Sequence, residues 1–350
     1  MAAQCVNVKN PPSAPLNPMH VSTKAPCRVD LAGGTLDIWP LYLFHERPVA
    51  VNFAVDRFTY CDVRTREDTA IILRSSDLKK EERFASFGEL YKARKYKLPL
   101  LGLLVRFFAP QTGIEVESGS EAPAGAGISG SSALMISVAS ALNKITGRGY
   151  ELEKLREIVQ NIEAQVIRVP TGSQDYYPAM YGGVAALELS PAGIRRTALP
   201  VSAAELNSRF VLAYTGAPRN SGINNWEVMK AHIDQDRAVH RNFNRIACIA
   251  NCMRDALERG DWDEAGRLLR DEWSHRRRNS PGITTPLIDR LVTVTRRAGA
   301  LGAKACGAGG GGCVVFLVEP DARPAVEREI EAAGAKVLKA AVAEDGVRVS

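Results

Sequence analysis

A stretch of small residues that runs straight into a helical pattern limits what this chain can fold into more than any other segment. Residues 121–133 read EAPAGAGISGSSA, and apolar residues have helical spacing over 131–145. Glycines let backbone N–H groups approach an anion closely, and a helix N-terminus adds the positive end of its dipole. The segment therefore predicts a phosphate-binding loop, although a glycine turn followed by an ordinary serine cap would have the same composition.

Two widespread nucleotide-binding loops do not match this segment. A P-loop places a lysine immediately before its serine or threonine, and no lysine precedes Ser131. The glycine spacing also differs from the dinucleotide-binding fingerprint, which follows the first strand of a βαβ unit near the start of a domain. The sequence therefore argues against a dehydrogenase.

Apolar periodicity along the rest of the chain predicts an α+β protein. The chain has 350 residues, 45% of them hydrophobic, which is enough for two domains with substantial cores. We expect a flexible N-terminal tail over 1–20, a first domain over 21–200 and a second domain over 201–350. Strands are predicted over 49–63, 71–74, 210–214, 313–318 and 336–342. Helices are predicted over 131–145, 152–166, 224–259, 262–275, 287–298 and 324–333.

Charge and cysteine usage narrow the possible functions. The net charge of +6 is spread along the chain, which favours small anionic ligands over nucleic acid. The longest apolar stretch, Leu98 to Ala109, is interrupted by Arg106 and is too short to cross a membrane. The N-terminus lacks a secretory pattern and the seven cysteines are scattered, so we expect a cytoplasmic protein. Cys248 and Cys252 share a helix face, and we expect them to pack in the core rather than bind zinc.

Three glycine-containing segments follow one another along the chain. Residues 25–37 read APCRVDLAGGTLD, residues 123–133 read PAGAGISGSSA, and residues 304–313 read KACGAGGGGC. Together they resemble the ordered motifs of the GHMP kinases, the superfamily of galacto-, homoserine, mevalonate and phosphomevalonate kinases, over about residues 22–320. The resemblance implies a two-domain α+β fold, in which the N-terminal domain is similar to the second domain of ribosomal protein S5 and the C-terminal domain is ferredoxin-like. It also implies ATP and Mg²⁺ as cofactors.

The resemblance assigns ligands to the central and late segments. The residues expected to bind ATP are Pro123, Gly125, Gly127, Ser129, Gly130, Ser131, Ser132 and Ala133. The glycines expected to lie beside the active site are Gly307, Gly309, Gly310 and Gly311. Ser131 and Glu163 would hold Mg²⁺. The family usually has two consecutive serines where this chain has Gly130-Ser131, so the metal could contact either Ser131 or Ser132.

Phosphoryl transfer needs a carboxylate that orients or deprotonates the attacking hydroxyl, together with cations that offset charge. By resemblance, Asp175 is the catalytic carboxylate and Arg28 is its charge partner. Asp37 would accept hydrogen bonds from the sugar hydroxyls. Three neighbours would shape the pocket around it: Gly33, Gly34 and Thr35.

Ordinary structural roles are the alternatives for these four residues. Arg28 could be a surface arginine that pairs with Asp30, and Asp37 could cap the segment that follows it. Glu163 could be a solvated carboxylate on its helix, and Asp175 could be a turn aspartate. Each of these readings would leave the residue outside any site.

The first segment also bears on the substrate. Its Gly-Gly pair resembles the heptose 7-phosphate kinase and fucokinase branch, whereas galactokinases have Gly-Glu-His. This branch implies a kinase for the anomeric hydroxyl of a sugar or sugar phosphate. A phosphorylated sugar would need further cations, for which Arg219 and the run His275–Arg278 are candidates, although a basic helix end is typically solvated. A kinase for a non-sugar alcohol such as mevalonate or homoserine, and a catalytically silent sugar sensor, are the alternatives; the oligomeric state stays open.

Overall fold

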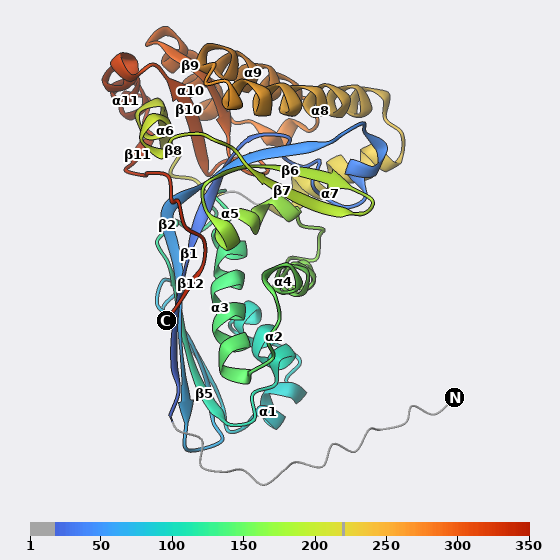
Figure 1. Cartoon of the computed structure of the whole chain (residues 1–350), viewed down its shortest axis with the longest axis vertical. Coiled ribbons are helices and arrows are strands. Elements are labelled where there is room, and N and C mark those ends of the chain that lie inside the picture. The colour runs from blue at the N-terminus through green and yellow to red at the C-terminus, as the bar shows by residue number, and fades with distance from the viewer. Residues whose placement is uncertain (1–17, 219–220) are drawn as a thin grey trace.

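The computed structural model describes residues 18–218 and 221–350, and its strands form two sheets that follow one another along the long axis of the molecule (Figure 1). The predicted α+β class is confirmed. The predicted tail over 1–20 falls mostly outside the described residues. The boundary near residue 200 stays a prediction, but the second sheet begins only after it, at Phe210.

The first sheet has eight strands. They are β1 (His20–Ala32), β2 (Val49–Arg66), β3 (Ile71–Ser75), β4 (Lys80–Phe84), β5 (Gly113–Ser120), β6 (Val184–Ser190), β7 (Gly193–Ala198) and β12 (Arg348–Val349). The strand order is β12-β1-β2-β5-β3-β4, and β6 and β7 extend it from the first half of β2. Neighbouring strands are antiparallel except β3 and β5. Because β2 pairs with β6 early and with β5 late, one long strand connects both ends of the sheet.

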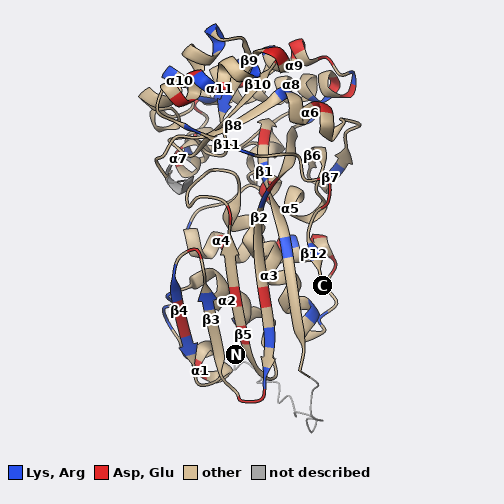
Figure 2. Cartoon of the chain, turned by 90° about the vertical axis from the view of Figure 1, so that its left-hand side faces the viewer, with Lys and Arg blue, Asp and Glu red and all other residues tan. Residues whose placement is uncertain are grey.

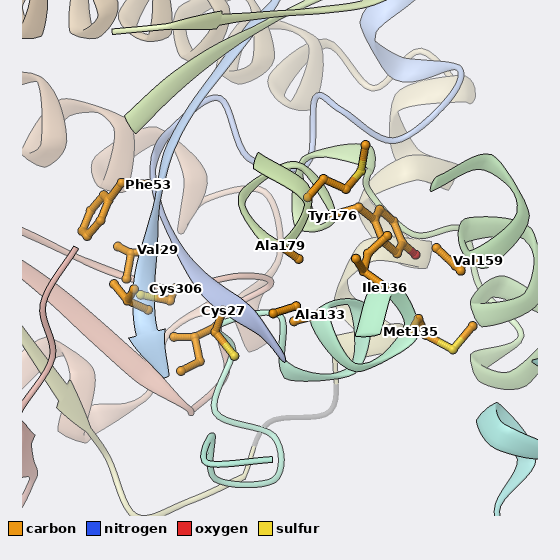
Figure 3. Close-up of a cluster of buried hydrophobic side chains, with 14 of the residues drawn as sticks. Cys27, Val29, Phe53, Ala133, Met135, Ile136, Val159, Tyr176, Ala179 and Cys306 are labelled. Atoms are coloured by element: carbon orange, nitrogen blue, oxygen red, sulfur yellow. The ribbon is translucent and has the colours of Figure 1, made fainter. Parts of the chain in front are cut away.

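Helices cover one face of this sheet (Figure 1). They are α1 (Phe87–Lys92), α2 (Pro99–Phe108), α3 (Gly130–Thr146), α4 (Leu152–Ile167) and α5 (Tyr177–Tyr181). The innermost helix, α3, packs on β1 and β2, and Figure 3 shows its Ala133 and Ile136 in the same core as Tyr176. Gly147, in the left-handed region at φ 63°, ends α3 by donating its N–H to Asn143. No helix in the described ranges is long and apolar enough to cross a bilayer.

The opposite face of the first sheet carries charges of both signs. Figure 2 shows Lys and Arg positions interspersed with Asp and Glu positions along β2 to β5. Arg74 on β3, for example, forms ion pairs with Glu81 on β4 and with Glu115 on β5. Cross-strand pairs of opposite charge suit a solvated sheet face.

The second sheet has four antiparallel strands in the order β11-β8-β10-β9. These strands are β8 (Phe210–Tyr214), β9 (Ala300–Ala305), β10 (Cys313–Val318) and β11 (Lys336–Leu338). The helices around them are α6 (Ala203–Arg209), α7 (Ser221–Ile233), α8 (Arg237–Glu258), α9 (Trp262–Arg276), α10 (Pro286–Arg297) and α11 (Arg323–Ala332). Numbered in chain order, the strands lie 4-1-3-2, which is the ferredoxin-like arrangement that the resemblance implied.

Two predicted elements differ from the structure. The helical stretch over 224–259 is divided into α7 and α8, because Gln235 adopts φ 63° and the Asp236 side chain caps the N-terminus of α8. The last predicted strand, 336–342, stops at Leu338 as β11. After β11 the chain returns to the first sheet, where β12 pairs with β1. Part of the predicted second domain, 201–350, therefore belongs structurally to the first sheet.

Candidate active site

A cleft of about 330 Å³ brings the three glycine-containing segments together. Its lining comes from β1 and the following loop, the 122–132 loop, α4, the 169–175 loop, and the second part of the chain. The predicted residues that line it are Arg28, Thr35, Asp37, Pro123, Gly125, Gly127, Ser129, Gly130, Ser131, Ser132, Glu163, Asp175 and Gly307. The structure thus gathers at one place residues that lie up to 279 positions apart in the sequence.

The 123–129 loop is held in place through its backbone. The carbonyl of Ile128 accepts a hydrogen bond from the N–H of Arg28 at 3.0 Å, and the carbonyl of Ala126 accepts one from Cys313 at 2.6 Å. Ser129, at φ 59°, turns the chain into α3. Its buried hydroxyl has no hydrogen-bond partner within the described part of the chain. An unpaired donor beside a helix N-terminus fits the phosphate groups of a nucleotide.

Glu163, on α4, is buried directly behind the start of α3. Its carboxylate accepts hydrogen bonds from Ser131, from Ser132 at 3.0 Å and from the hydroxyl of Tyr176 at 2.6 Å. Burial raises the pKa of Glu163, and the hydrogen bonds from Ser131 and Tyr176 partly offset this rise. Glu163 is therefore not a solvated carboxylate on its helix, and that alternative is wrong. A carboxylate with an adjoining hydroxyl is an oxygen donor set that suits Mg²⁺.

Arg28 is buried on β1, so the reading as a surface arginine is wrong. Its Nε and Nη2 donate to Oδ1 of Asp175 at 3.0 and 2.5 Å, while Nη1 donates to Asp30 and to the carbonyl of Gly127. Burial alone would lower the pKa of Arg28, but Asp175 and Asp30 raise it well above its usual range. The β1–β2 register shifts between Pro26 and Cys27 and again just after Asp30. These two irregularities bracket Arg28, as bulges beside functional side chains often do.

Asp37 is 1% exposed and lies against the loop that carries Asp175. Its carboxylate accepts hydrogen bonds from the backbone N–H and the side-chain amide of Gln174, at 2.8 and 3.2 Å. Burial, with the nearby charge of Asp175, raises the pKa of Asp37 to about 7. A side chain at Gly172 would collide with this carboxylate, which explains the glycine three residues before Asp175.

Several predicted glycines serve close packing instead of lining the cleft. Gly33 lies against the carbonyl of Val49 at φ 80°, and Gly34 lies against the guanidinium of Arg276. Among the four late glycines that were predicted, only Gly307 lines the cleft, whereas Gly309 packs on the carbonyl of Ile283. Gly310, Gly311 and Ala133 also lie outside the cleft lining.

Sequence reasoning missed a cluster of buried charges beneath the cleft. Its members are Asp30, Glu272, Arg276 and Lys304, all at most 4% exposed. The expectation of a solvated basic helix end is wrong for Arg276, although Arg278 beside it is exposed. A signal was present, because Leu269, Trp273 and Arg276 have the i, i+4, i+7 spacing of one helix face. The other phosphate candidate, Arg219, lies outside the described residues.

The cysteine prediction is also wrong. Cys248 and Cys252 are both exposed on α8, since the apolar face of that helix is formed by other residues. The part of the chain that the structure describes has no group of three or more His, Cys, Asp or Glu side chains arranged around a metal position. Any Mg²⁺ at Glu163 would therefore depend on hydroxyl, water and substrate oxygens, as is usual for this ion.

Known proteins resemble this chain over most of its length. Models for the "GHMP kinases N terminal domain" and "GHMP kinases C terminal" match residues 92–183 and 253–336, together just over half of the chain. D-glycero-alpha-D-manno-heptose 7-phosphate kinase of Campylobacter jejuni is 27% identical over 315 residues, 86% of this chain and 90% of that protein. Mevalonate kinase of Thermococcus sibiricus is 22% identical over 346 residues, 95% and 98% of the two chains. The structure of Lactococcus lactis galactokinase complexed with galactose superposes with a TM-score of 0.73 at 20% identity, covering 94% and 95%.

Proposed function

Because this chain belongs to the GHMP kinase family and is an ATP-dependent phosphotransferase, we propose that it phosphorylates a sugar, with the anomeric hydroxyl as the acceptor. One observation carries the proposal. The Arg28–Asp175 pair and the buried carboxylate of Asp37 face the same cleft as the 123–129 loop. A phosphate site and a polar acceptor site thus lie within reach of each other, as phosphoryl transfer requires.

The nucleotide would occupy the loop side of the cleft. Apolar side chains from three helices and two loops line that region: Leu78, Leu100, Leu134, Ile167 and Val169. They offer a surface for the adenine ring, while the N–H groups at the start of α3 and the hydroxyl of Ser129 face the phosphates. Glu163 and Ser131 would hold Mg²⁺, which when bound neutralises charge on the phosphate oxygens.

The chemical step would use Asp175 and Arg28. Asp175 accepts the proton of the sugar hydroxyl as its oxygen attacks the γ-phosphorus, and the bond from that phosphorus to ADP breaks. Two hydrogen bonds to one carboxylate oxygen fix the orientation of Asp175, and the other oxygen is left for the substrate. Asp37 holds a neighbouring hydroxyl, so the acceptor enters in one orientation.

A kinase for a non-sugar alcohol is the second candidate, because mevalonate kinases resemble the chain over almost its whole length. Asp37 favours the sugar, since a buried carboxylate that faces the acceptor suits a polyol with several hydroxyls. Arg28, Glu163 and Asp175 are all present, which argues against a silent sensor.

A coupled ADP-release assay over a panel of acceptors tests the proposal. The panel contains hexoses, deoxysugars, amino sugars, uronic acids, heptose phosphates, mevalonate and homoserine. We expect turnover with a sugar, and phosphorus NMR of the product should show a phosphate on the anomeric carbon. Turnover of mevalonate or homoserine alone would reject the sugar, and failure to bind ATP would reject the whole scheme.

Asp175→Asn tests the catalytic step separately. We expect turnover to fall by about 10² to 10⁴-fold with ATP binding retained, because the proton acceptor is lost while the 123–129 loop stays unchanged. Asp345→Asn, at an exposed aspartate of a surface ion pair, is the matched control and should keep the wild-type rate. A normal rate in Asp175→Asn would remove Asp175 from the base role.

A further inference from the structure

Arg276, at the end of α9, reaches the candidate active site from the opposite part of the chain. We propose that it is a positioning residue, which fixes the loop of residues 33–37 against the turn at Gly307 and does not bind a substrate phosphate. The kinetic part of this inference rests on the proposed kinase function. The structural part concerns the protein alone and can be tested without a substrate.

The guanidinium of Arg276 is fully engaged at its two terminal nitrogens. Nη2 donates to the hydroxyl of Thr35 at 3.1 Å and to the carbonyl of Gly307 at 2.5 Å. Nη1 lies 3.4 Å from both Asp30 and Glu272. These terminal N–H groups therefore connect two predicted site segments with two buried carboxylates. Little donor capacity is left for a phosphorylated substrate.

The buried carboxylate of Asp30 binds several groups around Arg276. Its Oδ1 accepts hydrogen bonds from Arg28 at 3.1 Å and from the backbone N–H of Gly307 at 2.9 Å. Its Oδ2 accepts one from Lys304 at 2.9 Å. Lys304 also pairs with Glu272 at 3.1 Å. Three buried cations thus face Asp30, Glu272 and Asp175, so every positive charge of the network is matched within the protein.

Two features of the 33–37 loop support a role for Arg276 in holding it. Thr35 adopts φ 73°, which is a rare conformation for a β-branched residue and persists where surrounding contacts impose it. Its hydroxyl is the group that Arg276 binds. At Gly34 a Cβ would collide with Nη1 of Arg276, although the backbone there is outside the left-handed region. Gly34 is therefore required by the guanidinium and not by its own backbone.

Gly34→Ala and Arg276→Lys should each disturb the contact between Arg276 and the loop of residues 33–37. Gly34→Ala displaces the guanidinium of Arg276 without removing a charge. Arg276→Lys keeps the positive charge but removes the planar guanidinium with its forked N–H donors. Arg276→Ala is included with the double variant Gly34→Ala/Arg276→Ala. Arg267→Ala removes an exposed arginine of the same helix, which pairs with Glu264 and Asp271 on the surface, and serves as the matched control.

Hydrogen exchange of the protein alone gives the first readout. We expect the amides of Ile38, which donates to Thr35, and of Gly307, which donates to Asp30, to exchange about tenfold faster in each single variant at 34 and 276. The helix α3 should keep its protection. Gly34→Ala should add no further acceleration in the Arg276→Ala background, because the side chain that it displaces is already gone. Unchanged exchange at both amides would overturn the proposal.

Kinetics with a free sugar and a phosphorylated sugar give the second readout. We expect the kcat/KM of Gly34→Ala and Arg276→Lys to fall by the same factor, about tenfold or more, for both acceptors, with the KM for ATP unchanged. A loss confined to the phosphorylated acceptor would show that Arg276 binds phosphate and would overturn the positioning role. If wild type turns over neither sugar, the proposed function fails, and the exchange result still decides the role of Arg276.

Discussion

The two serines at the start of α3 differ in exposure although both donate to Glu163. Ser131 is exposed to the cleft, and Ser132 is 2% exposed. Both serines line the cleft, and because Ser131 is the more exposed we expect it to supply the oxygen to an ion that enters with the nucleotide. We expect Ser131→Ala to raise the Mg²⁺ concentration for half-maximal activity by about tenfold or more, because a ligand is lost. In Ser132→Ala, the control, that concentration should stay near wild type while thermal stability falls. If Ser132→Ala raised this Mg²⁺ concentration more than Ser131→Ala does, Ser132 and not Ser131 would be the ligand.

Asp37 makes stability depend on pH. Its pKa is raised from 3.8 to about 7, so the folded protein keeps a proton that the unfolded chain has already lost. The resulting stabilisation is complete below about pH 4 and disappears as the pH rises through the folded pKa. Asp37→Asn cannot ionise. We therefore expect its free energy of unfolding, relative to wild type, to increase by a few kcal/mol between about pH 4 and pH 8 in urea titrations. If the free energies of unfolding of the two proteins changed with pH in the same way, the pKa of Asp37 would not be raised in the folded protein.

At the scale of single residues, the sequence identified side chains that belong to recognisable motifs. It missed a side chain whose burial is set by contacts with distant parts of the chain. Arg28, Asp37, Glu163 and Asp175 lie in segments with recognisable motifs, and the structure brings all four to one cleft. Their roles in phosphoryl transfer stay a prediction. Arg276 was missed because a run of basic residues normally marks a solvated helix end. Its burial depends on Asp30, which lies 246 positions away, and no local pattern reports such a contact.

Among the elements, predicted helices and strands with strong periodicity agree closely with the structure. The prediction over 152–166 corresponds to α4, and the prediction over 313–318 corresponds to β10. The error over 224–259 arose because the break between the two helices needs only one left-handed residue, Gln235. The sequence also could not show that the turn before β10 packs against the 123–129 loop.

Gly312 makes that contact between the turn and the 123–129 loop. It adopts φ 75°, and a Cβ there would lie 2.6 Å from the carbonyl of Ala126. We expect Gly312→Ala to raise the KM for ATP about tenfold, because the loop must shift. Gly147→Ala is the control, since it has a similar φ of 63° and nothing within 4 Å. It should cost about 1 kcal/mol of stability and leave the KM unchanged. Equal KM values in the two variants would show that the contact does not set the loop position.

The whole molecule is tied together by the return of its last residues to the first sheet. Val342 donates its N–H to the side chain of Asn207 at 2.7 Å, and Ala343 donates to Ala54 at 3.0 Å. Ser350 exchanges two backbone hydrogen bonds with Ser22 on β1. The sequence predicted none of this, because β12 is only two residues long and its position is set by the partner strand.

Removal of residues 341–350 should therefore weaken the whole fold and not only its end. The deletion frees the backbone of Ala54, Asp56 and Ser22 and exposes the edge of β1, the strand that carries Arg28. We expect the free energy of unfolding in urea to fall by about 3 kcal/mol or more, at about 1 kcal/mol for each lost hydrogen bond. Arg348→Ala is the control. Its ion pair with Asp345 is exposed, so it should change stability by less than about 0.5 kcal/mol. An unchanged free energy of unfolding after the deletion would mean that the first sheet is stable without its last strand.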